Sequence, residues 1–203
     1  MAAKYKVLFS DIGGVLLSNG WPHESREKAA QKFGLDYEEM NALHNFIFNV
    51  FEIGRITLDQ YLDTVVFHTE RKFSKEEFTE FMMAQSTELP EMLEWFIGWR
   101  NAHPEVKIIS INNEARELND HRIKKFRLHD FFDAFVSSCV VGMRKPDPGI
   151  FRIALGIAQA EPSECVYFDD RPMLVLAARK EGIHAHHHHD INITRQIINE
   201  AFG

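Results

Sequence analysis

The sequence predicts an α/β fold in which a doubly wound parallel sheet carries an inserted helical bundle. Short apolar strands alternate with helical stretches in the second half of the chain, and a long helical block follows the first strand. Alternating strands and helices of these lengths are typical of a Rossmann-like parallel sheet. We therefore expect residues 1–16 and 101–203 to form the core, and residues 17–100 to form an inserted helical block.

The strands are predicted from short runs of consecutive apolar residues, because a strand buried on both faces of a parallel sheet lacks polar alternation. The first run, YKVLFS, is followed by Asp-x-Gly-Gly, where Gly13 and Gly14 allow a sharp turn. Strands are expected at residues 5–10, 106–111, 134–138 and 165–168.

The helices are predicted from apolar periodicity and from capping residues. Thr57 and Ser74 each precede a helical stretch in the inserted block, as N-capping residues do. The many phenylalanines of this block are interpreted as the core of a small bundle. Helices are expected at about 36–52, 57–70, 74–85, 90–102, 114–127, 147–159 and 172–182.

Composition and charge indicate what size of core the chain can form and which partners it can bind. The chain has 203 residues with 45% apolar content, enough for one sizeable core with an inserted module. A formal net charge of −7 argues against nucleic acid as the main partner, because phosphate backbones require a basic face. Cys139 and Cys165 lie in apolar runs and are interpreted as reduced core residues. With no visible secretory signal or membrane span, we expect a cytoplasmic monomer or homodimer that binds a small molecule.

Polar residues stand at the ends of the predicted strands. In an open parallel sheet, ligands bind beyond the carboxyl ends of the strands. Three carboxylates brought together at that edge require a cation, and oxygen ligands favour Mg²⁺, which also accepts a substrate phosphate. The residues concerned are Asp11, Asn112, Asn113, Lys145, Asp169 and Asp170.

These segments resemble the four motifs of the haloacid dehalogenase-like superfamily, and the resemblance covers essentially the whole chain. The motifs are FSDIGGVLL, SINNE, GMRKPDPGIF and VYFDDRPMLVLAARKEGI. The helical block resembles the small cap that these enzymes carry after the first motif. In the family, such a cap closes over the substrate and excludes water.

The resemblance implies a role for each motif residue. Asp11 would be the nucleophile and form an aspartyl-phosphate. Mg²⁺ would be held by Asp11, the Gly13 carbonyl oxygen and Asp170, with Asp169 nearby. Lys145 would orient Asp11 and balance the charge of the phosphoryl group. The implied activity is hydrolysis of a small phosphorylated metabolite, with a sugar phosphate favoured.

Two departures from the family pattern affect this reading. Phosphatases of the family usually have Asp two residues after the nucleophile as general acid and base, whereas this chain has Gly13. Such assistance is worth roughly 10²–10⁴ in rate. His23, just after the first motif, is one candidate to replace it or to contact substrate. In the second motif, Asn112 stands where Ser or Thr is usual. An amide also donates to phosphoryl oxygens, so Asn112 and Asn113 are expected to bind the substrate.

Two alternative functions are also compatible with these residues. A true 2-haloacid dehalogenase needs no proton donor, so glycine at position 13 would not impair its activity. However, such enzymes need no Mg²⁺ and have fewer acidic residues in the fourth motif. A catalytically weak or inactive binding protein would have no electrostatic reason to keep the acidic cluster. Finally, the run His186–His189, with His184, is interpreted as an exposed loop rather than a metal site, because successive residues of an extended segment alternate faces.

Overall fold

The computed structural model describes residues 5–203 and contains a parallel sheet with β1 at its centre. Within these residues the sheet has five strands in the order β3-β2-β1-β4-β5, and every pairing is parallel. The predicted α/β class with a doubly wound, Rossmann-like sheet is confirmed. The strands are β1 (Val7–Ser10), β2 (Lys107–Asn112), β3 (Ala134–Ser137), β4 (Cys165–Asp169) and β5 (His184–His187).

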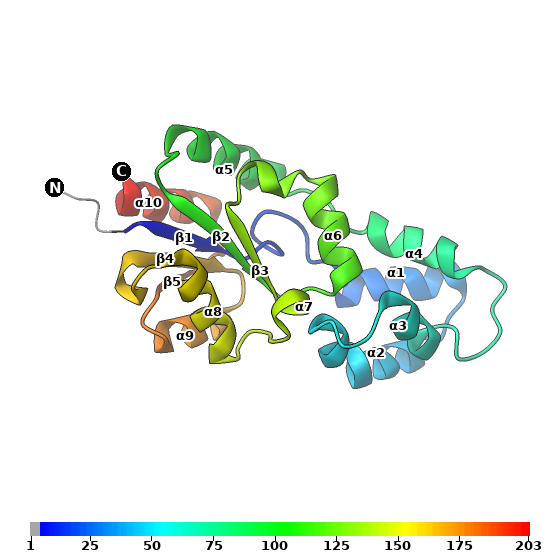
Figure 1. Ribbon diagram of the computed structural model, residues 1–203. Helices are drawn as coiled ribbons and strands as arrows, with labels where there is room; N and C mark the ends of the chain where they lie inside the picture. The colour runs from blue at the N-terminus through cyan, green and yellow to red at the C-terminus, as the bar shows by residue number, and fades with distance from the viewer. Residues whose placement is uncertain (1–4) are drawn as a thin grey trace.

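Helices cover both faces of the sheet, and consecutive side chains of β1 point to opposite faces. Leu8 packs in a hydrophobic cluster with α5 (Pro90–Ala102) and α10 (Ile191–Phe202). Val7 and Phe9 pack in a second cluster with α8 (Pro148–Ala158) and α9 (Pro172–Lys180). Figure 1 shows the sheet between these two layers, with α6 (Arg116–Lys125) and the short α7 (Ser138–Val141) beyond β2 and β3.

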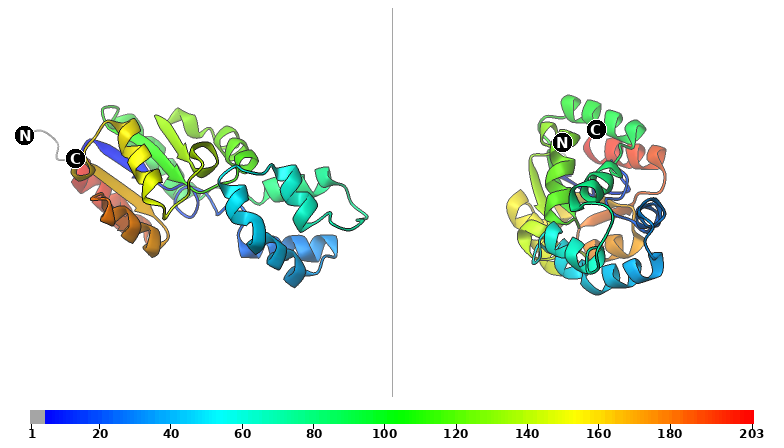
Figure 2. Two further views of the ribbon diagram at one scale, coloured as in Figure 1. Left: turned by 60° about the horizontal axis from the view of Figure 1, so that its bottom comes forward. Right: turned by 90° about the vertical axis from the view of Figure 1, so that its right-hand side faces the viewer.

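A separate lobe is built from the helices between β1 and α5. It has its own hydrophobic cluster, which also receives Ala115 and Leu118 from the core. Capping boxes at Thr57 and Ser74 start two of its helices. Figure 2 shows this lobe, the cap, lying beyond the carboxyl ends of the strands. Its helices are α1 (His23–Phe33), α2 (Tyr37–Glu52), α3 (Leu58–Val65) and α4 (Lys75–Ala84).

The cap ends earlier in the chain than residue 100. Helix α5 is part of the core, because Phe96 and Trp99 are buried in the cluster that contains Leu8 of β1. Two linkers join cap and core side by side, with Leu17 bridged to Glu88 in antiparallel fashion. Apolar periodicity alone cannot distinguish a helix that packs on the sheet from one that packs in the cap, which is why the predicted boundary differs.

The histidine run is not simply an exposed loop. His184–His187 form the edge strand β5, with Ala185 buried against β4 and His186 stacked on Phe168 at 5.5 Å between ring centroids. The prediction of a loop was wrong here, because this segment becomes a strand through its pairing with β4, and an edge strand needs few inward-facing apolar residues. No helix within residues 5–203 is long and apolar enough to cross a membrane.

Candidate active site

A cavity of about 480 Å³ lies between the carboxyl ends of the strands and the cap. Asp11, Asn112 and Lys145 line it from the core, while His44 and Glu52 line it from the cap. Because the first strand ends at Ser10 in the middle of the sheet, Asp11 emerges at the centre of this edge.

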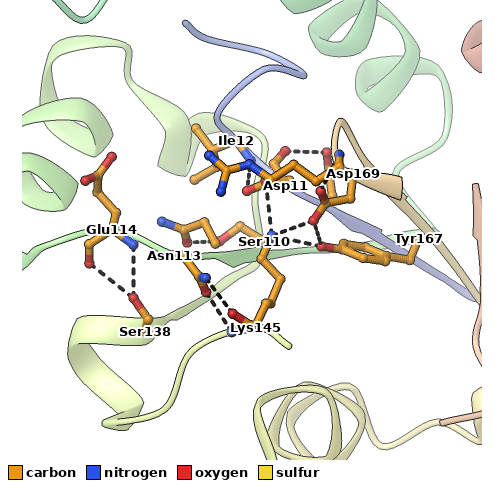
Figure 3. A network of polar contacts seen from close by, with 12 residues as sticks. Asp11, Ile12, Ser110, Asn113, Glu114, Ser138, Lys145, Tyr167 and Asp169 are labelled. Atoms are coloured by element: carbon orange, nitrogen blue, oxygen red, sulfur yellow. Dashed lines mark hydrogen bonds and ion pairs between the residues drawn. The ribbon is translucent and has the colours of Figure 1, made fainter. Parts of the chain in front are cut away.

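Lys145 joins the nucleophile position to the acidic motif. Its Nζ lies 3.0 Å from Asp11 Oδ2 and 2.7 Å from Asp169 Oδ2, and it donates to the Tyr167 hydroxyl at 2.9 Å. Tyr167 in turn donates to Asp169 Oδ2, as Figure 3 shows. The other Asp11 oxygen, Oδ1, accepts the backbone N–H of Ile12 at 2.7 Å. The Asp11 carboxylate is therefore held at both oxygens.

Burial dominates the electrostatics of this group. It raises the pKa of Asp11 to about 6, with Lys145 opposing the rise and Asp169 adding to it. Burial alone would lower the pKa of Lys145, but the two carboxylates beside it outweigh that effect and raise the pKa. Lys145 is thus a charged ammonium with 1% of its side chain exposed. Such a charge is tolerable inside a protein only because it is paired.

The backbone of Lys145 is fixed by Asn113. The Asn113 amide donates to the Lys145 carbonyl oxygen at 2.9 Å and accepts the Lys145 N–H at 2.8 Å (Figure 3). Asn113 also lines the cavity, but both ends of its side chain are used in this clasp. Its observed contacts therefore position the lysine, whereas the sequence predicted a contact with substrate.

Asp170 completes an acidic cluster that fits a cation. Carboxylate oxygens of Asp11, Asp169 and Asp170 lie within 4.8 Å of one another. Asp170 Oδ1 is buried and has no hydrogen-bond partner among residues 5–203, and burial and Asp169 raise the pKa of Asp170. Asp169 differs, because Lys145, Tyr167 and the Arg171 N–H occupy its two oxygens. Asp11 and Asp170 are thus the carboxylates best able to hold a metal, with Asp169 supporting them.

Residues 5–182 match the haloacid dehalogenase-like hydrolase family. The chain belongs to this family. It is a hydrolase with the α/β fold of that family, and the four motifs quoted above lie within the matched residues apart from Ile183, the last residue of the fourth motif.

Relatives with assigned names match this hydrolase over short segments. Bifunctional epoxide hydrolase 2 of Sus scrofa is 49% identical over 43 residues, which are 21% of this chain and 8% of that protein. Flavin mononucleotide hydrolase 1 of Arabidopsis thaliana is 36% identical over 59 residues, 29% of this chain and 24% of that one. An uncharacterised protein of Haemophilus influenzae is 24% identical over 188 residues, covering 88% of each chain.

Solved structures share the fold over most of the hydrolase. A HAD-family enzyme of Bacteroides thetaiotaomicron superposes with a TM-score of 0.77 and 22% identity, covering 90% of this chain and 93% of that one. The same enzyme was also solved with magnesium and inorganic phosphate, at a TM-score of 0.72, 22% identity and the same two coverages. L-2-haloacid dehalogenase of Xanthobacter autotrophicus superposes with a TM-score of 0.64 and 15% identity, covering 96% and 83%.

The remaining predicted site residues have different surroundings. Asn112 ends β2 and lines the cavity, but its Oδ1 accepts from Ser137 at 2.9 Å and its Nδ2 donates to Asn119 at 3.0 Å. His23 lines the cavity from the start of α1, with 55% of its side chain exposed and its Nε2 3.1 Å from Glu27. Gly13 lines the cavity beside Asp11, and its carbonyl oxygen accepts no backbone hydrogen bond from residues 5–203.

Two residues near the nucleophile were not singled out from the sequence. Tyr167 lies within the predicted strand CVYF, and a tyrosine buried there needs a partner for its hydroxyl, which is a usable signal. Glu52 lies at the end of a cap helix and lines the cavity. Nothing in the sequence indicates that this helix end meets the core.

Proposed function

We propose that this hydrolase is a Mg²⁺-dependent phosphatase that acts on a small phosphorylated metabolite, with sugar phosphates favoured. The observation that carries the proposal is the cluster of Asp11, Asp169 and Asp170 around a single lysine. Three carboxylates and one ammonium leave a net negative charge that a divalent cation would neutralise. The unpartnered Asp170 Oδ1 offers a ligand of the kind that Mg²⁺ prefers.

The chain's own residues suggest the course of the reaction. An oxygen of Asp11 attacks phosphorus, the bond from phosphorus to the leaving oxygen breaks, and water then releases phosphate from the aspartyl-phosphate. Bound Mg²⁺ would supply charge neutralisation for substrate oxygens. Lys145 keeps Asp11 oriented and places a fixed positive charge where the transferring group carries its negative charge.

A second candidate function is hydrolysis of a 2-haloacid. It is favoured by Gly13, because halide leaves without a proton, and by the fold shared with L-2-haloacid dehalogenase. The acidic cluster weighs against it, since Asp169 and Asp170 would repel an anionic haloacid.

The test compares two reactions in one preparation. We expect p-nitrophenyl phosphate to be hydrolysed with Mg²⁺, and the rate to fall to background when EDTA removes the metal. We expect no chloride release from 2-chloropropionate, with or without Mg²⁺. Chloride release that is unaffected by EDTA, without phosphate ester hydrolysis, would establish the dehalogenase function instead.

Gly14→Ala is expected to weaken Mg²⁺ binding by displacing Asp170. A Cβ at residue 14 would lie 2.1 Å from Asp170 Oδ2, and the φ of +69° adds about 1 kcal/mol of strain for alanine. Mg²⁺ at about 100 times its Kd stabilises a protein by about 2.7 kcal/mol. At 203 residues this corresponds to a Tm increase of roughly 5–10 °C.

We expect wild type to show this Mg²⁺-induced increase in differential scanning fluorimetry, and Gly14→Ala to lose most of it. The matched control is Gly156→Ala in α8, where a new Cβ has nothing within 4 Å. An undiminished Mg²⁺ effect in Gly14→Ala would show that Asp170 does not hold the ion.

A further inference from the structure

Contacts between the cap and the core position Glu52, a cap residue, at the cavity. Glu52 ends α2, and its carbonyl oxygen accepts the Ser138 hydroxyl at 2.6 Å. Two residues later, Gly54 has a φ of +70°, and a Cβ there would lie 2.4 Å from the Cys139 carbonyl oxygen. The backbone of the cap therefore packs tightly on α7 of the core. This contact places the Glu52 side chain in the cavity that also contains Asp11 and Gly13.

The Glu52 side chain is 23% exposed, but one oxygen of its carboxyl group is buried without a hydrogen-bond partner. Oε2 has none among residues 5–203. It forms an ion pair with Arg144 Nε at 2.8 Å, in a geometry that is not that of a hydrogen bond. Arg144 itself is fixed by Asn49 and by the Phe48 ring, whose centroid is 4.9 Å from its guanidinium carbon. A buried carboxyl oxygen left in this state is suited to a partner that arrives with the substrate.

Charged groups on several elements affect the pKa of the Glu52 carboxyl group. Burial raises its pKa to about 7, against the opposing effect of Arg144. Glu114, after β2, raises the pKa further, whereas Arg171, before α9, and Lys145 lower it. A carboxyl group in these surroundings holds its proton in a large fraction of molecules near neutral pH and can also exist as the carboxylate. General acid–base catalysis needs both states.

Other ionisable groups that line the cavity are less suited to proton transfer. Burial lowers the pKa of His44 to about 3, so this histidine has no acidic proton near neutral pH. Glu114 is bound by Arg122 at 2.6 Å and accepts the Ala115 N–H, which leaves it committed to the core. His23 and Glu24 are exposed at the start of α1.

We propose that Glu52 is the general acid and base of the reaction. The cap supplies this residue in place of the aspartate that the family's phosphatases have at the position of Gly13, and the inference rests on the proposed phosphatase function. As the bond between phosphorus and the leaving oxygen breaks, the proton of the Glu52 carboxyl group passes to that oxygen. The resulting carboxylate then takes a proton from the water that attacks the aspartyl-phosphate, which restores Glu52 and releases phosphate.

The test uses Glu52→Gln and the leaving-group dependence of kcat/KM. Phenyl, p-nitrophenyl and 2,4-dinitrophenyl phosphate share a ring but differ in how much the leaving oxygen needs a proton. Since kcat/KM reports formation of the aspartyl-phosphate alone, we expect a loss of about 10²–10⁴ for phenyl phosphate and almost none for dinitrophenyl phosphate. The kcat for dinitrophenyl phosphate should still fall, because water attack on the intermediate also uses Glu52.

The pH profile provides a second readout. Because only the protonated carboxyl group donates, wild-type kcat/KM for phenyl phosphate should decline as pH rises through about 7. Glu52→Gln should lack this decline, and wild type with dinitrophenyl phosphate should lack it too.

Glu117→Gln is the matched control. Glu117 also lies at the boundary between cap and core, where its Oε1 accepts the Leu58 N–H at 3.0 Å and its Oε2 is buried without a partner. It does not line the cavity, so we expect its leaving-group dependence to equal that of wild type.

An equal loss of kcat/KM for all three esters in Glu52→Gln would indicate a structural role and overturn the inference, as would no loss at all. Either result would leave the phosphatase function intact, provided that wild type hydrolyses the esters with Mg²⁺. If wild type hydrolysed none of them, the proposed function would fail first, and the inference with it.

Discussion

Asp11→Asn is expected to abolish phosphate ester hydrolysis, with a loss on the order of 10⁴-fold or more in kcat. An amide cannot form the covalent intermediate, and neither of the two neighbouring aspartates is placed to replace Asp11. Asp169 is bound by Lys145 and Tyr167, and Asp170 lies at the turn that follows β4. The measurement is steady-state hydrolysis of p-nitrophenyl phosphate with Mg²⁺, for wild type and variant prepared side by side.

The fold should tolerate this change, which makes the loss interpretable. Asparagine retains an oxygen to accept the Ile12 N–H, and it removes a buried negative charge that lies close to Asp169. We therefore expect a Tm within a few degrees of wild type, in the absence of metal. Activity within about tenfold of wild type would exclude Asp11 as the nucleophile.

Lys145→Met is expected to be the most destabilising single change at the site. Removing the ammonium leaves Asp11 and Asp169 buried without their counter-charge. Breaking a buried ion pair in this way costs about 3–5 kcal/mol. We expect urea unfolding in metal-free buffer at pH 7.5 to show a loss of this size, together with loss of phosphatase activity. Lys107→Met is the control, because the Lys107 ammonium donates to a neutral group, the Ala158 carbonyl oxygen, at 2.7 Å.

The destabilisation caused by Lys145→Met should increase as pH rises. Burial already raises the pKa of Asp11 above its ordinary value of 3.8, and removing Lys145 would raise it further. The folded variant then binds more protons than the unfolded chain, so its stability falls as pH rises through the folded pKa. We expect the gap between wild type and Lys145→Met to be small at pH 4.5 and wide at pH 7.5. A gap of constant size would contradict the electrostatic explanation.

The core of the molecule could be predicted closely because its signals are local. Continuous apolar runs mark β1, β2, β3 and β4, and parallel strands bring their carboxyl ends to one edge. The structure accordingly places Asp11, Lys145, Asp169 and Asp170 together, as strand order and chain order require.

Features that depend on distant contacts could not be predicted in the same way. The edge strand β5 has a polar sequence, and pairing with β4 is what makes it a strand. Helix α5 has the periodicity of a cap helix but packs on β1. The clasp of Asn113 on Lys145 joins residues from two loops, and the position of Glu52 depends on how the cap docks on α7.

The covalent intermediate on Asp11 offers the most direct test of the proposed function. With 2,4-dinitrophenyl phosphate, the intermediate should form faster than it is hydrolysed. Acid quenching within the first turnover should therefore trap it. We expect a burst of dinitrophenolate close to one per enzyme, and a peptide containing Asp11 that gains the mass of one phosphoryl group. Steady hydrolysis without a burst, with the Asp11 peptide unmodified, would contradict the account.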